Sequence, residues 1–145
     1  MWGDRSRSAD SGRDGEASDR VLVVEDHRDV REIFARVLAM HGYEVRSAAN
    51  GAEALAALAG GGFAALVCDL GLPDIPGIEV IEAARKQHPE IAVIVLTGLT
   101  TAELAQDLFD KGCDAILLKP LPSLRTLPDA VKEILKRRRG EAAGR

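Results

Sequence analysis

Three acidic residues stand directly after apolar runs of the chain. Glu25 and Asp26 follow RVLVV, and Asp69 follows FAALVC. If these two runs are neighbouring parallel strands, their carboxyl ends meet at one edge of a sheet and the three carboxylates share a pocket. Like charges so close together are unfavourable unless a proton or a cation intervenes, and Mg²⁺ prefers oxygen ligands. We therefore predict a magnesium site at Glu25, Asp26 and Asp69. The simpler alternative is that these acids only begin loops or cap helices.

Two further residues end apolar runs at the same edge. Thr97 follows IAVIVL and Lys119 follows AILL, which adds a hydroxyl and an ammonium to the acids. Each residue taken alone has a simpler interpretation, as a β-branched strand residue or a surface lysine. Together with the acids they predict a phosphorylated carboxylate, because a cation and a lysine neutralise a transferring phosphoryl group while hydroxyl and backbone donors bind its oxygens.

The elements that must position these residues are short apolar runs that alternate with segments of helical periodicity. We expect strands at 20–25, 43–48, 63–69, 91–97 and 115–118. Helices are expected over about 28–41, from the cap Asn50 to Gly60, from about 78 to before Pro89, from the Thr100 and Glu103 cap pair to Gly112, and from Pro128 onward. Strict alternation predicts a doubly wound parallel sheet of order 2-1-3-4-5 with five helices on its two faces.

Composition limits the protein to a single core and excludes several functions. The 145 residues are 46% hydrophobic, 29% charged and only 3% aromatic, so one α/β domain with a core of Val, Leu, Ile and Ala is expected. The net charge of -4 and the lack of a basic stripe argue against direct nucleic-acid binding. Cys68 and Cys113 lack the spacing of a disulfide framework or zinc site and suit a reducing cytoplasm. No run is apolar enough for membrane insertion or a secretory signal.

The two ends of the chain have a different composition from the middle. Residues 1–19 mix Ser, Gly, Asp, Arg and Glu, which predicts a disordered leader. A basic helical end followed by GEAAGR predicts a frayed tail over 139–145. The folded domain is therefore expected at 20–138.

Four segments of this domain resemble a known family. VLVVEDHRDVR, LVCDLGLPDIPGIEVI, VIVLTG and ILLKP are similar to the signature segments of the receiver domain of two-component response regulators. The resemblance covers roughly residues 20–138, with Gly112 and Lys119 at the spacings after Thr97 that the family uses. It implies a flavodoxin-like fold and a phosphorelay function.

The resemblance also implies a role for each residue of the site. Asp69 would be the phosphoacceptor that forms 4-aspartylphosphate, and Thr97 and Lys119 would contact the phosphoryl group. Glu25, Asp26, Asp69 and the backbone carbonyl of Gly71 would hold Mg²⁺. The peptide bond between Lys119 and Pro120 would be cis.

A receiver takes its phosphoryl group from a histidine kinase or a histidine phosphotransfer protein. It catalyses its own phosphorylation and dephosphorylation and is not otherwise an enzyme. Its downstream protein target would dock on the face made by the fourth helix, fifth strand and fifth helix. Because only a short basic segment follows the fifth helix, we expect a stand-alone receiver, and the alternative is a fragment of a hybrid kinase or longer regulator.

One position departs from the family pattern, and two rival functions remain. Receivers usually have Tyr or Phe three residues before the lysine, where this chain has Ile116, which we expect to be fully buried strand core. A pseudo-receiver, which only binds partners, is the first rival. The second is an aspartate-nucleophile phosphatase, but that class expects an acid where this chain has Gly71.

Overall fold

The computed structural model describes residues 19–98 and 100–142. Its strands are β2 (Arg20–Val24), β3 (Glu44–Ala48), β4 (Ala65–Asp69), β5 (Ala92–Thr97) and β6 (Ala115–Leu118), and its helices are α1 (Arg28–Met40), α2 (Gly51–Gly60), α3 (Gly77–Gln87), α4 (Ala102–Asp110) and α5 (Thr126–Ala142). All strand pairs are parallel and the sheet order is β3-β2-β4-β5-β6. In chain order this is 2-1-3-4-5, which confirms the predicted flavodoxin-like topology.

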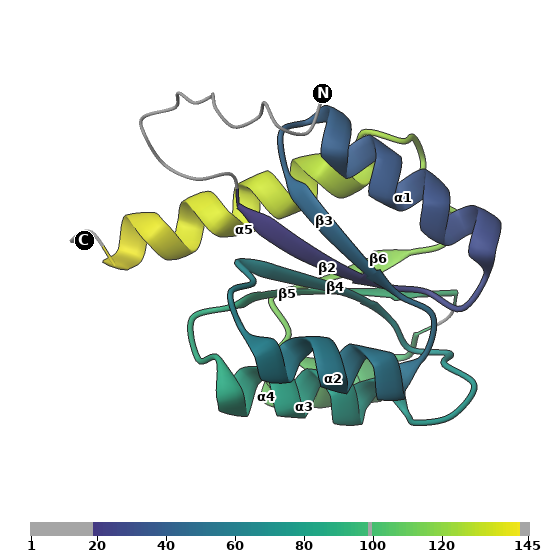
Figure 1. Cartoon of the computed structure of the whole chain (residues 1–145). Helices are drawn as coiled ribbons and strands as arrows, with labels where there is room; N and C mark the ends of the chain where they lie inside the picture. Colours follow the sequence, from purple (N-terminus) through teal and green to yellow (C-terminus); the bar gives the residue numbers. More distant parts are fainter. Residues whose placement is uncertain (1–18, 99, 143–145) are drawn as a thin grey trace.

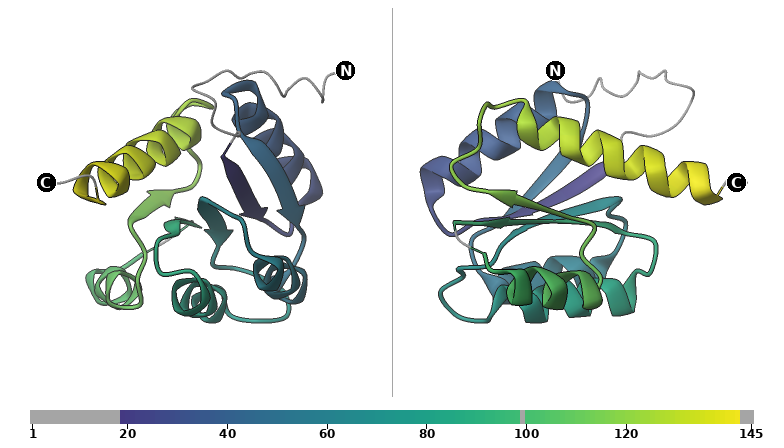
Figure 2. Two further views of the ribbon diagram at one scale, coloured as in Figure 1. Left: turned by 60° about the vertical axis from the view of Figure 1, so that its left-hand side comes forward. Right: turned by 180° about the vertical axis from the view of Figure 1, so that it is seen from behind.

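The helices cover both faces of the sheet. Helices α1 and α5 lie on one face, and α2, α3 and α4 lie on the other (Figure 1). Figure 2 shows the same three layers in a view turned by 60° and from behind. Helix α1 connects strands in one direction along the sheet, and α2, α3 and α4 connect them in the other, so right-handed crossovers place α1 on the opposite face from these three. Helix α5 follows the last strand and packs on the same face as α1.

The core consists of two apolar clusters, one on each face of the sheet. Along β2, Val21 and Val23 belong to the cluster beneath α1 and α5, while Leu22 and Val24 belong to the cluster above α2, α3 and α4. All four side chains are fully buried. A strand buried on both faces has no polar positions, and for this reason the run RVLVV is continuously apolar.

Two helices begin at residues other than those expected. The N-cap of α4 is Thr101 and not Thr100, because the Thr101 side chain accepts the bond from the Leu104 N–H. Helix α5 begins at Thr126, two residues before the expected Pro128. A proline fits in the first turn because its missing N–H would have no partner there. By contrast, Asn50 caps α2 as predicted, accepting from the Glu53 N–H.

The ends of the described chain are held by the domain. Helix α5 continues to Ala142, past the expected limit at 138, and the Arg139 guanidinium makes two bonds to the Asp19 carboxylate at 2.8 and 3.0 Å. Residues 1–18 of the predicted leader and residues 143–145 of the predicted tail lie outside the described residues.

No helix in the described part of the chain is both long and apolar enough to cross a membrane. Cys68 and Cys113 are both free and buried.

Candidate functional site

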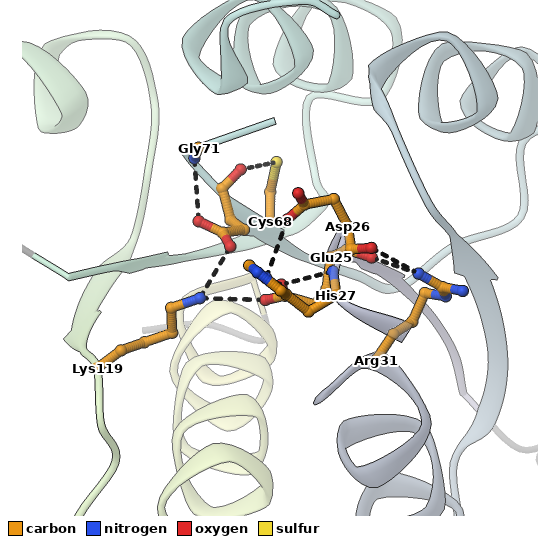
Figure 3. A network of polar contacts seen from close by, with 8 residues as sticks. Glu25, Asp26, His27, Arg31, Cys68, Gly71 and Lys119 are labelled. Atoms are coloured by element: carbon orange, nitrogen blue, oxygen red, sulfur yellow. Dashed lines mark hydrogen bonds and ion pairs between the residues drawn. The ribbon is translucent and has the colours of Figure 1, made fainter. Parts of the chain in front are cut away.

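The acid pair lies in the short connection between β2 and α1. Val24 ends the strand, Glu25 and Asp26 follow, and α1 begins at Arg28. The Glu25 side chain is fully buried, whereas 29% of the Asp26 side chain is exposed. The Arg31 guanidinium, one turn into α1, donates to the backbone carbonyls of Glu25 at 2.8 Å and of Asp26 at 3.3 Å. The backbone that carries both acids is therefore fixed by a side chain of the following helix (Figure 3).

Lys119 joins the first acid to the acid at the end of β4. Its Nζ lies 2.9 Å from Asp69 Oδ2 and 3.2 Å from Glu25 Oε1. The other oxygen, Asp69 Oδ1, accepts the backbone N–H of Gly71 at 3.0 Å. Asp69 is only 6% exposed. The structure thus brings together three of the predicted site residues, contributed by β4 and by the segments that follow β2 and β6 (Figure 3).

The ionisation of this cluster follows from its contacts. Burial alone would raise the pKa of Asp69, but the bonds from Lys119 and from the Gly71 N–H outweigh it, so the pKa lies below its ordinary value. Burial would likewise lower the pKa of Lys119, and the two carboxylates that face its ammonium raise it instead. Both groups are charged at neutral pH, which leaves an anionic Asp69 oxygen at the rim of the sheet.

The geometry adds a residue to the site that the sequence analysis did not identify. His27 donates its backbone N–H to Glu25 Oε2, and its ring Nδ1 lies 3.1 Å from Glu25 Oε2 and 3.4 Å from Asp26 Oδ1. One donor atom each from Glu25, Asp26 and His27 lies within 4.8 Å of the others, a group that does not include Asp69. The position of His27 directly after the acid pair was the available signal in the sequence.

Asp26 provides the test of whether these residues suit a divalent cation. Its Oδ1 is buried and has no hydrogen-bond partner among the described residues, since the contact to His27 lacks hydrogen-bond geometry. A buried carboxylate oxygen without a partner is costly. A cation bound by carboxylates would remove this cost, so the donor set fits a hard divalent ion.

The loop from Asp69 to α3 is held at two points. Asp74 accepts the N–H groups of Gly51 and Ala52 at the start of α2, at 2.8 and 2.9 Å, and these bonds lower its pKa. At the other end of the loop, α3 begins at Gly77, where a Cβ would lie 2.7 Å from Leu70 Cα and 2.9 Å from the Asp69 carbonyl. Only glycine allows α3 to begin this close to the backbone of Asp69 and Leu70.

Thr97 and Ile116 lie on the neighbouring strands β5 and β6. Thr97 ends β5, is 7% exposed, and its carbonyl accepts the Lys119 N–H at 2.8 Å. Ile116 pairs with Val95 in β6 and is only partly buried, so the prediction of full burial was wrong. The reason is that β6 is the edge strand of the sheet, with a neighbour on one side only. The Lys119–Pro120 peptide bond is cis, as expected from the resemblance.

Fold and site define a doubly wound α/β domain whose acids and lysine gather at the carboxyl ends of the strands. The chain belongs to the response regulator receiver domain family, whose model matches residues 21–132. It is therefore a receiver of the two-component type, a signalling module and not a classical enzyme.

Individual relatives and solved structures agree with this assignment. The transcriptional regulatory protein PrrA of Mycobacterium tuberculosis is 36% identical over 124 residues, which are 86% of this chain and 53% of PrrA. The chain thus spans about half the length of the curated relatives it matches. A CheY-like receiver domain protein from Methanospirillum hungatei is 32% identical with a TM-score of 0.82, covering 86% of this chain and 99% of that one.

One solved relative carries the modification itself. A response regulator from Burkholderia pseudomallei, with a phosphorylated aspartic acid and a calcium ion, is 28% identical with a TM-score of 0.74, covering 87% of this chain and 74% of that one.

Proposed function

We propose that Asp69 accepts a phosphoryl group from a histidine of a histidine kinase or a histidine phosphotransfer protein. In this proposal Mg²⁺ is held by Glu25, Asp26, Asp69 and the carbonyl of Gly71. The reaction takes place in the cytoplasm, where the two free cysteines stay reduced.

The contact between Lys119 Nζ and Asp69 Oδ2 at 2.9 Å carries this proposal. An ammonium that holds a carboxylate ionised at a strand end prepares an anionic nucleophile and a positive charge for the oxygens of an incoming phosphoryl group. The phosphorylated aspartic acid of the Burkholderia pseudomallei relative supports the same chemistry.

The transfer forms one bond and breaks one. An oxygen of the Asp69 carboxylate attacks phosphorus, the bond between phosphorus and the donor histidine nitrogen breaks, and its electron pair stays on the imidazole, which takes a proton from solvent. The Lys119 ammonium then contacts a phosphoryl oxygen and the Thr97 hydroxyl donates to another. Glu25, Asp26, Asp69 and the Gly71 carbonyl would hold Mg²⁺, which would supply positive charge for the phosphoryl oxygens. Water reverses the modification when it attacks the same phosphorus, releasing inorganic phosphate and the free carboxylate.

The downstream partner binds the face made by α4, β6 and α5. Two large apolar side chains of these elements are exposed, Phe109 of α4 at 47% and Leu118 of β6 at 52%. Exposed large apolar side chains are common at protein interaction sites.

The signal reaches this face without an aromatic switch. Ile116 has no polar tip that could favour a solvated rotamer over a packed one, so its surroundings hardly change on phosphorylation. The backbone after Thr97 moves instead, at Gly98, Thr100 and Thr101 and at the start of α4. Amide chemical shifts with and without a phosphoryl mimic on Asp69 test this: large changes limited to β6 around Ile116 would contradict it.

Labelling with a small phosphoryl donor tests the assignment of Asp69. Purified protein with Mg²⁺ and acetyl phosphate should gain base-labile phosphate at one residue, and Asp69→Asn should remain folded and gain none. Asp74→Asn is the control from the same loop: its one side-chain oxygen can still accept the Gly51 N–H, although the Ala52 N–H loses its acceptor, so the folding of this variant is checked alongside that of Asp69→Asn. Full labelling of Asp69→Asn would refute the assignment.

The same experiment separates the rival functions. A pseudo-receiver would show no labelling in the parent protein. An aspartate-nucleophile phosphatase would turn over many equivalents of donor, whereas a receiver accumulates phosphate on one residue.

A further inference from the structure

His27 occupies an unusual position for a histidine. It is the N-cap residue of α1, yet its side chain makes no capping bond to the helix. The ring turns instead toward the two acids, with Nδ1 between Glu25 Oε2 and Asp26 Oδ1 (Figure 3). Cap positions favour Ser, Thr, Asp or Asn, whose side chains accept helix N–H groups. The ring therefore contributes nothing to the helix end and is available to the site.

The position of Nδ1 is set by its surroundings. Glu25, its first neighbour, is fully buried, and the His27 backbone N–H is bonded to the same Oε2 that the ring contacts. Arg31 fixes the backbone of both acids. Although 73% of the His27 side chain is exposed, its coordinating nitrogen faces the acids. The open side leaves room for the water ligands that Mg²⁺ usually keeps.

The distances match those of ligands that share one cation. Two ligand atoms at adjacent corners of an octahedron, each about 2.1 Å from the ion, lie about 3.0 Å apart. Nδ1 lies 3.1 Å from Glu25 Oε2 and 3.4 Å from Asp26 Oδ1. Asp26 Oδ1 is also the buried oxygen that has no hydrogen-bond partner among the described residues.

We propose that His27 Nδ1 is a ligand of the divalent cation, alongside the carboxylates of Glu25 and Asp26. This inference rests on the cation site of the proposed function and adds a nitrogen donor to it. Imidazole suits Ni²⁺, Zn²⁺ and Fe²⁺, whereas Mg²⁺ prefers oxygen. The site therefore selects borderline metals more strongly than a site made of oxygen alone.

Manganese as a spectroscopic probe tests the nitrogen ligand directly. In pulsed EPR, Mn²⁺ bound to the untagged full chain should show modulation from a coupled ¹⁴N nucleus, and labelling the protein with ¹⁵N-histidine should replace it with the ¹⁵N pattern. This comparison requires no variant. Asp26→Asn should abolish the signal, which assigns it to the acid site and not to another histidine.

Affinities provide the second test. His27→Gln keeps a side-chain donor for Glu25 but loses the nitrogen ligand, so Ni²⁺ affinity should fall roughly tenfold or more. Mg²⁺ affinity should change by no more than about twofold. His41→Gln is the matched control, since His41 is an exposed histidine at the other end of α1, where its Nδ1 contacts the Val37 carbonyl. It should change neither value.

The outcomes separate this inference from the proposed function. Mn²⁺ that binds in the parent and is lost in Asp26→Asn, but shows no nitrogen coupling, would overturn the His27 ligand and leave the cation site intact. An unchanged ratio of Ni²⁺ to Mg²⁺ affinity in His27→Gln would do the same. Mn²⁺ binding that is unaffected by Asp26→Asn would overturn both.

Discussion

Replacement of Lys119 by methionine is the sharpest test of how the site is held together without metal. Methionine keeps most of the side-chain volume and removes the ammonium that lies 2.9 Å from Asp69 and 3.2 Å from Glu25. Two nearly buried carboxylates then face each other with no positive charge between them. The metal-free protein should lose stability.

The burial of the three groups sets the magnitude. Removing one partner of a buried ion pair costs about 3–5 kcal/mol, because the remaining charge is left uncompensated. Here the exposed fractions of the side chains are 26% for Lys119, 8% for Asp69 and zero for Glu25. Water screens the lysine in part, so we expect a loss of about 3 kcal/mol, at the lower end of that range.

Mg²⁺ should reduce this loss. A cation at the acids neutralises the charges that Lys119 neutralised, and without the ammonium it is no longer repelled, so the variant should bind Mg²⁺ more tightly than the parent. A ligand at 100 times its Kd stabilises a protein by about 2.7 kcal/mol. The difference in free energy of unfolding between variant and parent should therefore shrink as Mg²⁺ is added.

Urea titrations of parent and variant, with chelator and with increasing Mg²⁺, measure both effects. Lys111→Met is the matched control, because Lys111 also lies near two carboxylates, Glu82 and Asp107, each at 3.6 Å on the surface. It should cost far less and show no dependence on Mg²⁺. The argument fails if the two variants lose equal stability in chelator, or if Mg²⁺ leaves the loss in Lys119→Met unchanged.

Three further predictions concern the acids and the loop after β4. Because the folded pKa of Asp69 is lowered from 3.8, its contribution to stability is complete above about pH 4 and is lost as the pH falls through the folded value. Metal-free urea titrations from about pH 6 to pH 2 should show a loss of stability in the parent that is smaller in Asp69→Asn. Identical pH curves of the two proteins would contradict the pairing of Asp69 with Lys119. Asp26→Asn should stabilise the metal-free protein and weaken Mg²⁺ binding, and calorimetry that finds neither would refute a shared cation site. Gly77→Ala should cost about 1–3 kcal/mol of stability and slow labelling of Asp69, since the added Cβ lies less than 3.0 Å from backbone atoms. Gly60→Ala is the control, because a Cβ at Gly60 has no atom within 4 Å. Equal stability of the two variants would count against tight packing at Gly77.

The element types were predictable because each is a local property of the chain, and the sheet order was predictable because strict alternation of strands and helices indicates a doubly wound sheet. Runs such as IAVIVL are buried on both faces and therefore continuously apolar, and Gly42 and Gly112 follow α1 and α4 with φ of 95° and 109°, a conformation that favours glycine. Helix starts were less predictable. Thr100 and Thr101 are both good caps, and only the direction of the backbone decides that the Thr101 hydroxyl reaches the Leu104 N–H.

The sequence alone determined which groups meet at the edge of the sheet. Once the strands are parallel and their order follows from alternation, residues at their carboxyl ends must converge, and this places Asp69, Glu25 and Lys119 together. The tertiary structure decided how each side chain is oriented and how deeply it is buried. It turns the His27 ring toward the acids and leaves Ile116 partly buried at the sheet edge. Asp74 likewise reaches the start of α2, more than twenty residues away in the chain. Such contacts depend on distances of a few ångströms between segments that are remote in sequence, and neither periodicity nor spacing specifies them.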